Sequence, residues 1–187
     1  MCTIKELREL LTIDPGTSVE TIEKVFRNLA ELLLNGFAIK KGKHIYRFVE
    51  IEFYHNYTDN GENITYPRKA KAGEWFFHDS GVDLTFNSDD LSYGGILIRS
   101  IKKDNDFICG PHNVEFELFD QFSALEAPDD FPCIIQIDNS EVISPVDTTR
   151  WNIKNDKRYR YCLPNSIWQN SKKYTAYPWY CNGKLKK

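Results

Sequence analysis

Residues 46–57 constrain the fold of this chain more than any other stretch of its sequence. Aromatic and branched side chains alternate there with Arg and Glu, which is the two-residue period of a half-buried β-strand. Successive side chains of a strand point to opposite faces. The apolar face would hold Val49, Ile51 and Phe53, and the polar face would hold Glu50, Glu52 and Tyr54. Two carboxylates beside an aromatic ring suit the activation of water next to a flat ligand, so the polar face is the first candidate site.

The remaining elements are predicted to be two helices followed by strands. Apolar residues recur at helical spacing over 4–11 and again from a cap at Thr17 or Ser18 to Asn35 and Gly36. Hairpins are predicted over 37–54 and 74–87, a buried strand over 94–101, a helix over 109–118, and short strands over 133–137, 158–162 and 177–181. This order predicts one α+β domain, 1–187, with a mostly antiparallel curved sheet or barrel-like roll behind N-terminal helices.

Charge is distributed very unevenly along the chain. The net charge is −3 and the pI is about 5.8, which argues against indiscriminate binding to nucleic acid. Residues 104–149 contain eleven acids and no Lys or Arg, whereas residues 150–187 contain ten Lys and Arg and one acid. The basic, aromatic segment is either a local surface for an anionic partner or a piece docked on the acidic part of its own domain. The candidate DNA contacts within it are Arg150, Arg158, Arg160, Lys172 and Lys173.

Several classes of protein do not fit this sequence. No apolar run is long enough to span a membrane, and the N-terminus lacks the form of a signal peptide. We therefore expect a cytoplasmic protein, with access to the nucleoid or nucleus if DNA is its substrate. Five scattered cysteines without a paired spacing favour neither a disulfide framework nor a zinc site. We expect no cofactor, no bound metal and a monomer.

Two charged residues stand out as candidates for catalysis. Glu52 can act as a general base that deprotonates water, or it can be an ordinary solvated strand residue. Arg99 ends the buried strand, where a guanidinium is costly unless it meets a carboxylate or a ligand. If Arg99 lies near Glu52, the catalytic interpretation of both becomes stronger. His78 with Asp79 and Asp83 could bind a metal, but a single His with nearby acids is a weak pattern for one.

A series of short motifs resembles the alkyladenine (3-methylpurine) DNA glycosylases. The series begins with a helix, the segment 34–40 and the strand 46–54, and continues with the loop 66–69 and the hairpin 71–87. The buried strand 95–101 and the Gly-Pro start of a helix at 110–111 complete it. Each motif is weak alone, but their order over residues 17–118 matches that of the family.

The resemblance implies a chemistry and a set of site residues. Members of the family hydrolyse the N-glycosidic bond of a modified purine that is flipped out of DNA, without a metal. By position, Glu52 would activate the water and Arg99 would be the arginine that follows the buried strand. The base pocket would hold Tyr54, either Phe77 or His78 as the opposing wall, Asn87 to select the purine, and His55 or Tyr57 in place of the family's histidine.

The chain also departs from the family. The family inserts a bulky tyrosine from the hairpin tip into the space left by the flipped base, whereas the tip here is Asp79-Ser80-Gly81. Three functions therefore stay open. The chain can be a glycosylase acting on duplex or single-stranded DNA, a catalytically silent module that binds nucleic acid or protein, or a hydrolase of a small nucleoside-like ligand.

Overall fold

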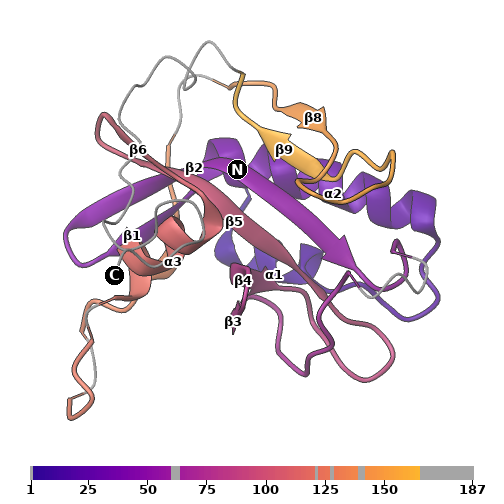
Figure 1. Cartoon of the computed structure of the whole chain (residues 1–187), viewed down its shortest axis with the longest axis horizontal. Coiled ribbons are helices and arrows are strands. Elements are labelled where there is room, and N and C mark those ends of the chain that lie inside the picture. The colour runs from indigo at the N-terminus through magenta and orange to yellow at the C-terminus, as the bar shows by residue number, and fades with distance from the viewer. Residues whose placement is uncertain (1, 60–63, 121, 127–128, 139–141, 165–187) are drawn as a thin grey trace.

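The three helices in the described part of the chain begin where the sequence predicts them. The computed structural model describes residues 2–59, 64–120, 122–126, 129–138 and 142–164. Helix α1 spans Ile4–Leu10, α2 spans Val19–Gly36 and α3 spans Pro111–Phe119 (Figure 1). The Ser18 hydroxyl caps α2 by accepting a hydrogen bond from the Thr21 amide at 3.3 Å, which satisfies one of the free amides of the first turn. The predicted strand 177–181 lies outside the described residues.

Nine strands among the described residues form one antiparallel sheet. They are β1 Phe37–Lys41, β2 His44–His55, β3 Trp75–His78, β4 Gly81–Thr85, β5 Gly94–Lys103, β6 Asp106–Cys109, β7 Cys133–Gln136, β8 Val146–Thr148 and β9 Arg160–Cys162. The main order is β3-β4-β5-β2-β1-β7, with β6 paired to β5 and β9 paired to β2 and β8. The sequence predicted neither β6 nor β8 as a separate strand.

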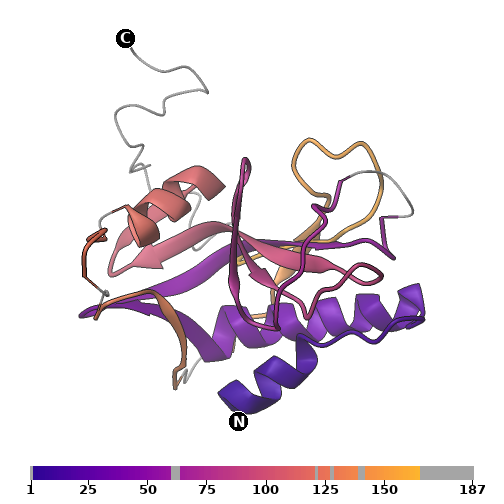
Figure 2. The ribbon, with the colours of Figure 1, turned by 90° about the horizontal axis from the view of Figure 1, so that it is seen from below.

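Helices cover both faces of the sheet, which curls into a half-barrel. Helices α1 and α2 lie against one face and α3 lies on the other (Figure 2). In the core under α2, the Phe26 ring stacks on Phe53 of β2 with 4.7 Å between centroids. This architecture confirms the predicted α+β fold with a curved antiparallel sheet and N-terminal helices. Within the described ranges, no helix has both the length and the apolar character needed to cross a bilayer.

Strand β2 places the predicted polar face at the centre of the sheet. One of its edges pairs with β5, and the other pairs first with β1 and then, at residues 50–52, with β9. Because Phe53 points toward α2, the alternation directs Glu52 and Tyr54 to the opposite face, which also carries α3. An irregularity in the pairing with β5 falls between Phe48 and Ile51.

Candidate active site

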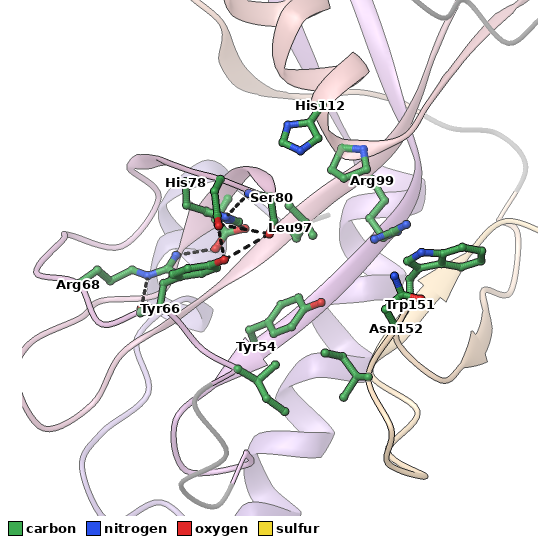
Figure 3. Close-up of a pocket in the computed structure, with 15 residues that line it drawn as sticks. Tyr54, Tyr66, Arg68, His78, Ser80, Leu97, Arg99, His112, Trp151 and Asn152 are labelled. Carbon is green, nitrogen blue, oxygen red and sulfur yellow. Dashed lines mark hydrogen bonds and ion pairs between the residues drawn. The ribbon is translucent and has the colours of Figure 1, made fainter. Parts of the chain in front are cut away.

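A cavity of about 950 Å³ lies on the face of the sheet that carries α3. Its walls come from β2, β4 and β5, from the loop before β3, from the β3–β4 turn, from the start of α3 and from residues 151–153 (Figure 3). Tyr54 and Arg99, on neighbouring strands, face it together with Trp151. The volume is at the upper end of the range of about 300–1,000 Å³ found for small-molecule sites.

Glu52 lies directly behind this cavity and has no exposed surface. Its Oε2 accepts hydrogen bonds from the Tyr54 hydroxyl at 2.8 Å and from the Arg99 guanidinium at 3.2 Å. Its Oε1 accepts a hydrogen bond from the Trp151 backbone amide at 2.8 Å. Burying a carboxylate is costly unless it is paired and hydrogen-bonded, and these three donors meet that requirement. Glu52 is therefore not a solvated strand residue.

Glu50 and Glu52 are buried and share Arg99 within a group of four charges, whose two arginines are partly exposed. The Arg99 Nε donates to Glu50 Oε1 at 3.1 Å while its other arm reaches Glu52. Arg160 approaches from β9, with Nε 2.6 Å from Glu50 Oε1 but without hydrogen-bond alignment, and 4.0 Å from Glu52 Oε1. The Ser100 hydroxyl donates to Glu50 Oε2 at 2.7 Å. Two carboxylates and two guanidiniums thus neutralise each other behind the cavity.

Tyr54 links this charged group to the cavity wall, which Arg99 also lines. Burial, followed by the charge of Glu52, raises the pKa of Tyr54 far above its usual value, so its hydroxyl stays protonated and donates to Glu52. The Arg150 guanidinium lies 4.8 Å from the centroid of the Tyr54 ring, within the range of a cation–π contact. The ring is thereby held in one position as part of the cavity wall.

Residues 150–153, which we call the wall segment, are fixed by their first two members to β2 and to the residues that follow it. The Arg150 guanidinium is 2% exposed and binds Asp59 with both arms, at 2.8 and 3.2 Å. Trp151 donates its amide to Glu52, and Asn152 adopts a left-handed backbone with φ of 59°. Asparagine is among the side chains that adopt this region most readily, so the residue suits the turn of the segment.

The opposite wall is an aromatic and charged layer from the β3–β4 hairpin and the loop before it. The Tyr66 ring stacks on His78 with 4.6 Å between centroids. Arg68 forms a buried ion pair with Asp83 at 2.6 Å, and His78 Nε2 lies 3.0 Å from the other oxygen of Asp83 without hydrogen-bond alignment. The Tyr66 hydroxyl donates to Asp79. In the described ranges, no three His, Cys, Asp or Glu side chains come together as a metal site.

The structure brings together only some of the residues predicted for the site. Tyr54, His78 and Arg99 line the cavity, with Glu52 behind them. His55, Phe77 and Asn87 do not line it. Phe77 is 46% exposed and packs on Phe119 of α3, which settles the hairpin register in favour of His78. Asn87 follows the end of β4 and is exposed. Its backbone amide donates to the Leu11 carbonyl near α1.

His55 belongs to the core instead of the cavity. It is fully buried on the same face of β2 as Phe53 and contacts Phe86 with 5.7 Å between ring centroids. Its Nδ1 accepts a hydrogen bond from the Tyr57 amide at 3.3 Å. Burial lowers the pKa of His55 to about 4, although the nearby Asp59 acts in the opposite direction.

This burial makes the stability of the protein depend on pH. The imidazole titrates near 6.5 in the unfolded chain and near 4 in the folded one, so the unfolded state binds more protons between these values. The contribution of His55 is complete above about pH 6.5 and falls by about 3 kcal/mol as the pH drops to about 4. Urea denaturation over this range should show the slope in the native protein. His55→Gln should remove it, while His44→Gln, a partly exposed control, should keep it.

The basic residues predicted to contact DNA are mostly paired with acids. Arg150 is buried against Asp59, and Arg160 faces Glu50. Arg158 is exposed and lies 3.3 Å from Asp147. Arg150 therefore offers no surface to a phosphate and instead supports the wall segment. Lys172 and Lys173 lie outside the described residues.

Sequence reasoning missed the Arg68–Asp83 pair, the Tyr66 ring and His112 as parts of the cavity. One signal for the buried pair was present in Gly94 and Gly95 at the start of β5. A Cβ atom on Gly95 would lie 2.7 Å from the Arg68 guanidinium and 2.8 Å from Asp83, so the glycine makes room for the ion pair. Two adjacent glycines opening a buried strand indicate that other groups approach the backbone closely there.

Comparison with known proteins does not assign a function to this site. The chain matches none of the protein-family models and none of the curated proteins with which it was compared, so its function is inferred from the site alone.

Proposed function

We propose that the chain is an N-glycosylase that hydrolyses the N-glycosidic bond of a modified purine in DNA, with Glu52 activating the water. The observation that carries the proposal is the position of Glu52. A fully buried carboxylate, held by three donors, lies behind the wall of a large cavity that has aromatic side chains on two sides. Such a cavity suits a flat base that is stacked and hydrogen-bonded outside the helix.

The reaction needs one proton acceptor and one attacking water. The water oxygen bonds to C1′ of the sugar as the bond from C1′ to the base nitrogen breaks, and the electron pair of that bond leaves with the base. Glu52 accepts the proton that the water loses. Arg99 and the Trp151 amide hold the carboxylate in place, and the negative charge of Glu52 stabilises the positive charge that develops on the sugar.

The carboxylate retains the capacity to bind this water. A carboxylate offers about four acceptor positions, and the Tyr54, Arg99 and Trp151 donors occupy three of them. The remaining position is on Oε1, beside the Trp151 amide. Because Glu52 has no exposed surface, the proposed reaction requires a side chain at the cavity wall to move and admit the water to Oε1.

An excision assay on oligonucleotides containing hypoxanthine, 1,N6-ethenoadenine or 3-methyladenine tests the proposal. We expect Glu52→Gln to slow release of the base by about 10²–10⁴-fold, the usual effect of losing a general base. Glu50→Gln is the matched control, because Glu50 lies on the same strand and face and also binds Arg99. It should slow release by less than about tenfold, since Glu50 does not contact the water.

Folding must be measured in both variants. The amide group of a glutamine at position 52 faces the Trp151 donor on one side or the Tyr54 and Arg99 donors on the other, so some loss of stability is expected. Melting temperatures separate that loss from a loss of chemistry. Base release that survives Glu52→Gln in a folded protein removes Glu52 from the role of general base.

The burial of Glu52 also favours a second candidate, a silent module of the same fold that binds nucleic acid. A carboxylate with three protein donors and no exposed surface is a sound structural anchor without any catalysis. This candidate predicts that oligonucleotides bind but that no base is released from any of the three lesions.

A further inference from the structure

We propose that the substrate is an unpaired stretch of DNA and that Trp151 stacks on the base next to the one held in the cavity. The proposal rests on the proposed function, because it names the form of DNA that this same cavity accepts. Three features of the described residues support it. They are an exposed tryptophan on a fixed backbone, a hairpin turn that is tied into the cavity wall, and guanidiniums around the cavity that are already paired with carboxylates.

Trp151 is an exposed aromatic residue at the cavity. Its side chain is 60% exposed, although tryptophan is on average highly buried in folded proteins. Its backbone is fixed by the hydrogen bond from its amide to Glu52 and by the buried Arg150 immediately before it. Because this backbone is already fixed, stacking of a flat partner on the ring has to order only the side chain. Aromatic platforms of this kind hold successive bases of single strands.

The β3–β4 turn is not built to open a duplex. The Tyr66 hydroxyl binds Asp79 and lies 3.3 Å from the Ser80 hydroxyl, so the turn is tied to the loop before β3. Gly81 packs so closely on α3 that a Cβ atom would lie 2.8 Å from Pro111. Extracting a paired base costs a few kcal/mol in unpairing and unstacking, and proteins that distort a duplex often insert an apolar side chain between the bases. An unpaired base avoids this cost.

The charges around the cavity also favour a single strand. Four guanidiniums lie in or behind its walls, and each already faces a carboxylate. The pairs are Arg68 with Asp83, Arg99 with Glu50 and Glu52, Arg150 with Asp59, and Arg160 with Glu50. Binding to duplex DNA depends mainly on neutralising phosphates with unpaired cations. Binding to a single strand also uses cationic contacts, but it gains a further share of its affinity from stacking of bases on aromatic rings. The pairing of these guanidiniums should therefore weaken it less than it weakens binding to a duplex.

Fluorescence anisotropy with a labelled oligonucleotide tests this proposal. The probe is a short strand with one central hypoxanthine, used alone and annealed to its complement. The full chain should bind the single strand at least about tenfold more tightly than the duplex. Trp151→Ala should weaken single-strand binding by about tenfold to about a hundredfold, the range for loss of one stacked base, and Trp151→Phe should restore part of it.

Phe77→Ala is the matched control, because Phe77 is a similarly exposed aromatic residue that does not line the cavity. It should leave binding unchanged. Trp151→Ala keeps the main-chain amide that binds Glu52, so the fold and the carboxylate are expected to be preserved. Equal or tighter binding to the duplex overturns the proposal, as does a Trp151→Ala effect no larger than that of the control.

The same samples separate this inference from the proposed function. Release of hypoxanthine from the duplex in preference to the single strand supports the glycosylase and overturns the single-strand substrate. Trp151-dependent binding of the single strand without release of any base supports the platform and overturns the glycosylase.

Discussion

Replacing Arg150 by alanine is expected to lower the free energy of unfolding by about 3–5 kcal/mol, the cost of breaking a buried ion pair from one side. The guanidinium binds Asp59 with both arms, donates to the Phe53 carbonyl at 3.2 Å and lies between the rings of Tyr54 and Tyr159. Without it, the Thr65 hydroxyl is the one donor to the Asp59 carboxylate that remains among the described residues. Urea denaturation at neutral pH measures the loss.

Arg158→Ala provides the matched control for this variant. Arg158 is in the same basic stretch, 150–187, and also pairs with an aspartate, Asp147, but its side chain is exposed. Exposed ion pairs contribute about 0–1 kcal/mol, so this variant should unfold almost as the native protein does. Equal losses in the two variants would show that the Arg150 pair does not stabilise the core. Arg150→Ala should also reduce any excision activity, because the Trp151 amide loses its neighbouring anchor.

Gly94→Ala is expected to lower the free energy of unfolding by about 3 kcal/mol or more, which exceeds the usual cost of overpacking. A Cβ atom on Gly94 would lie 2.3 Å from the Tyr54 carbonyl oxygen and 3.0 Å from the His55 Cα. Both are backbone atoms of β2, which pairs with β5 at this position. Relief of the clash requires the two central strands to separate, which also displaces the Tyr54 ring from the cavity wall.

Gly36→Ala is the control for the added methyl group. Gly36 is the last residue of α2, and a Cβ atom there would meet nothing within 4 Å. Alanine favours helix over glycine by up to about 1 kcal/mol, so the variant should be as stable as the native protein or slightly more so. Thermal unfolding of the two variants side by side checks both results. A Gly94→Ala protein with the same melting temperature as the native protein contradicts the packing described for β2 and β5.

The sequence predicted the parts of the fold that depend on local pattern. The alternation along 46–54 correctly assigned Glu52 and Tyr54 to one face of a strand, and Arg99 ends beside them because β5 pairs with β2. The same alternation places His55 on the face of Phe53, so its burial could have been predicted from its position alone. The choice between Phe77 and His78 required the register of the hairpin, which local periodicity does not fix.

The remaining parts of the site depend on contacts between residues far apart in the chain. The wall segment has no regular period, and its attachment to the residues that follow β2 relies on a pair, Arg150 and Asp59, that are 91 residues apart. The basic composition of 150–187 left open either a surface for an anionic partner or a piece docked on the acidic part of the domain. Arg150 and Arg160 are used internally to balance carboxylates. Composition counts charges but does not reveal which of them neutralise each other in the folded protein.

The hydrogen bond from Trp151 to Glu52 spans 99 residues, so the sheet and the site form at different times as the chain is synthesised. As the chain leaves the ribosome, β2 and β5 are complete about fifty residues before the wall segment is synthesised, and contacts of such long range form late in folding. Until then Arg99 alone balances the two glutamates. The site therefore matures after the sheet that carries it, and a nascent chain gains its cavity only once the wall segment has been made.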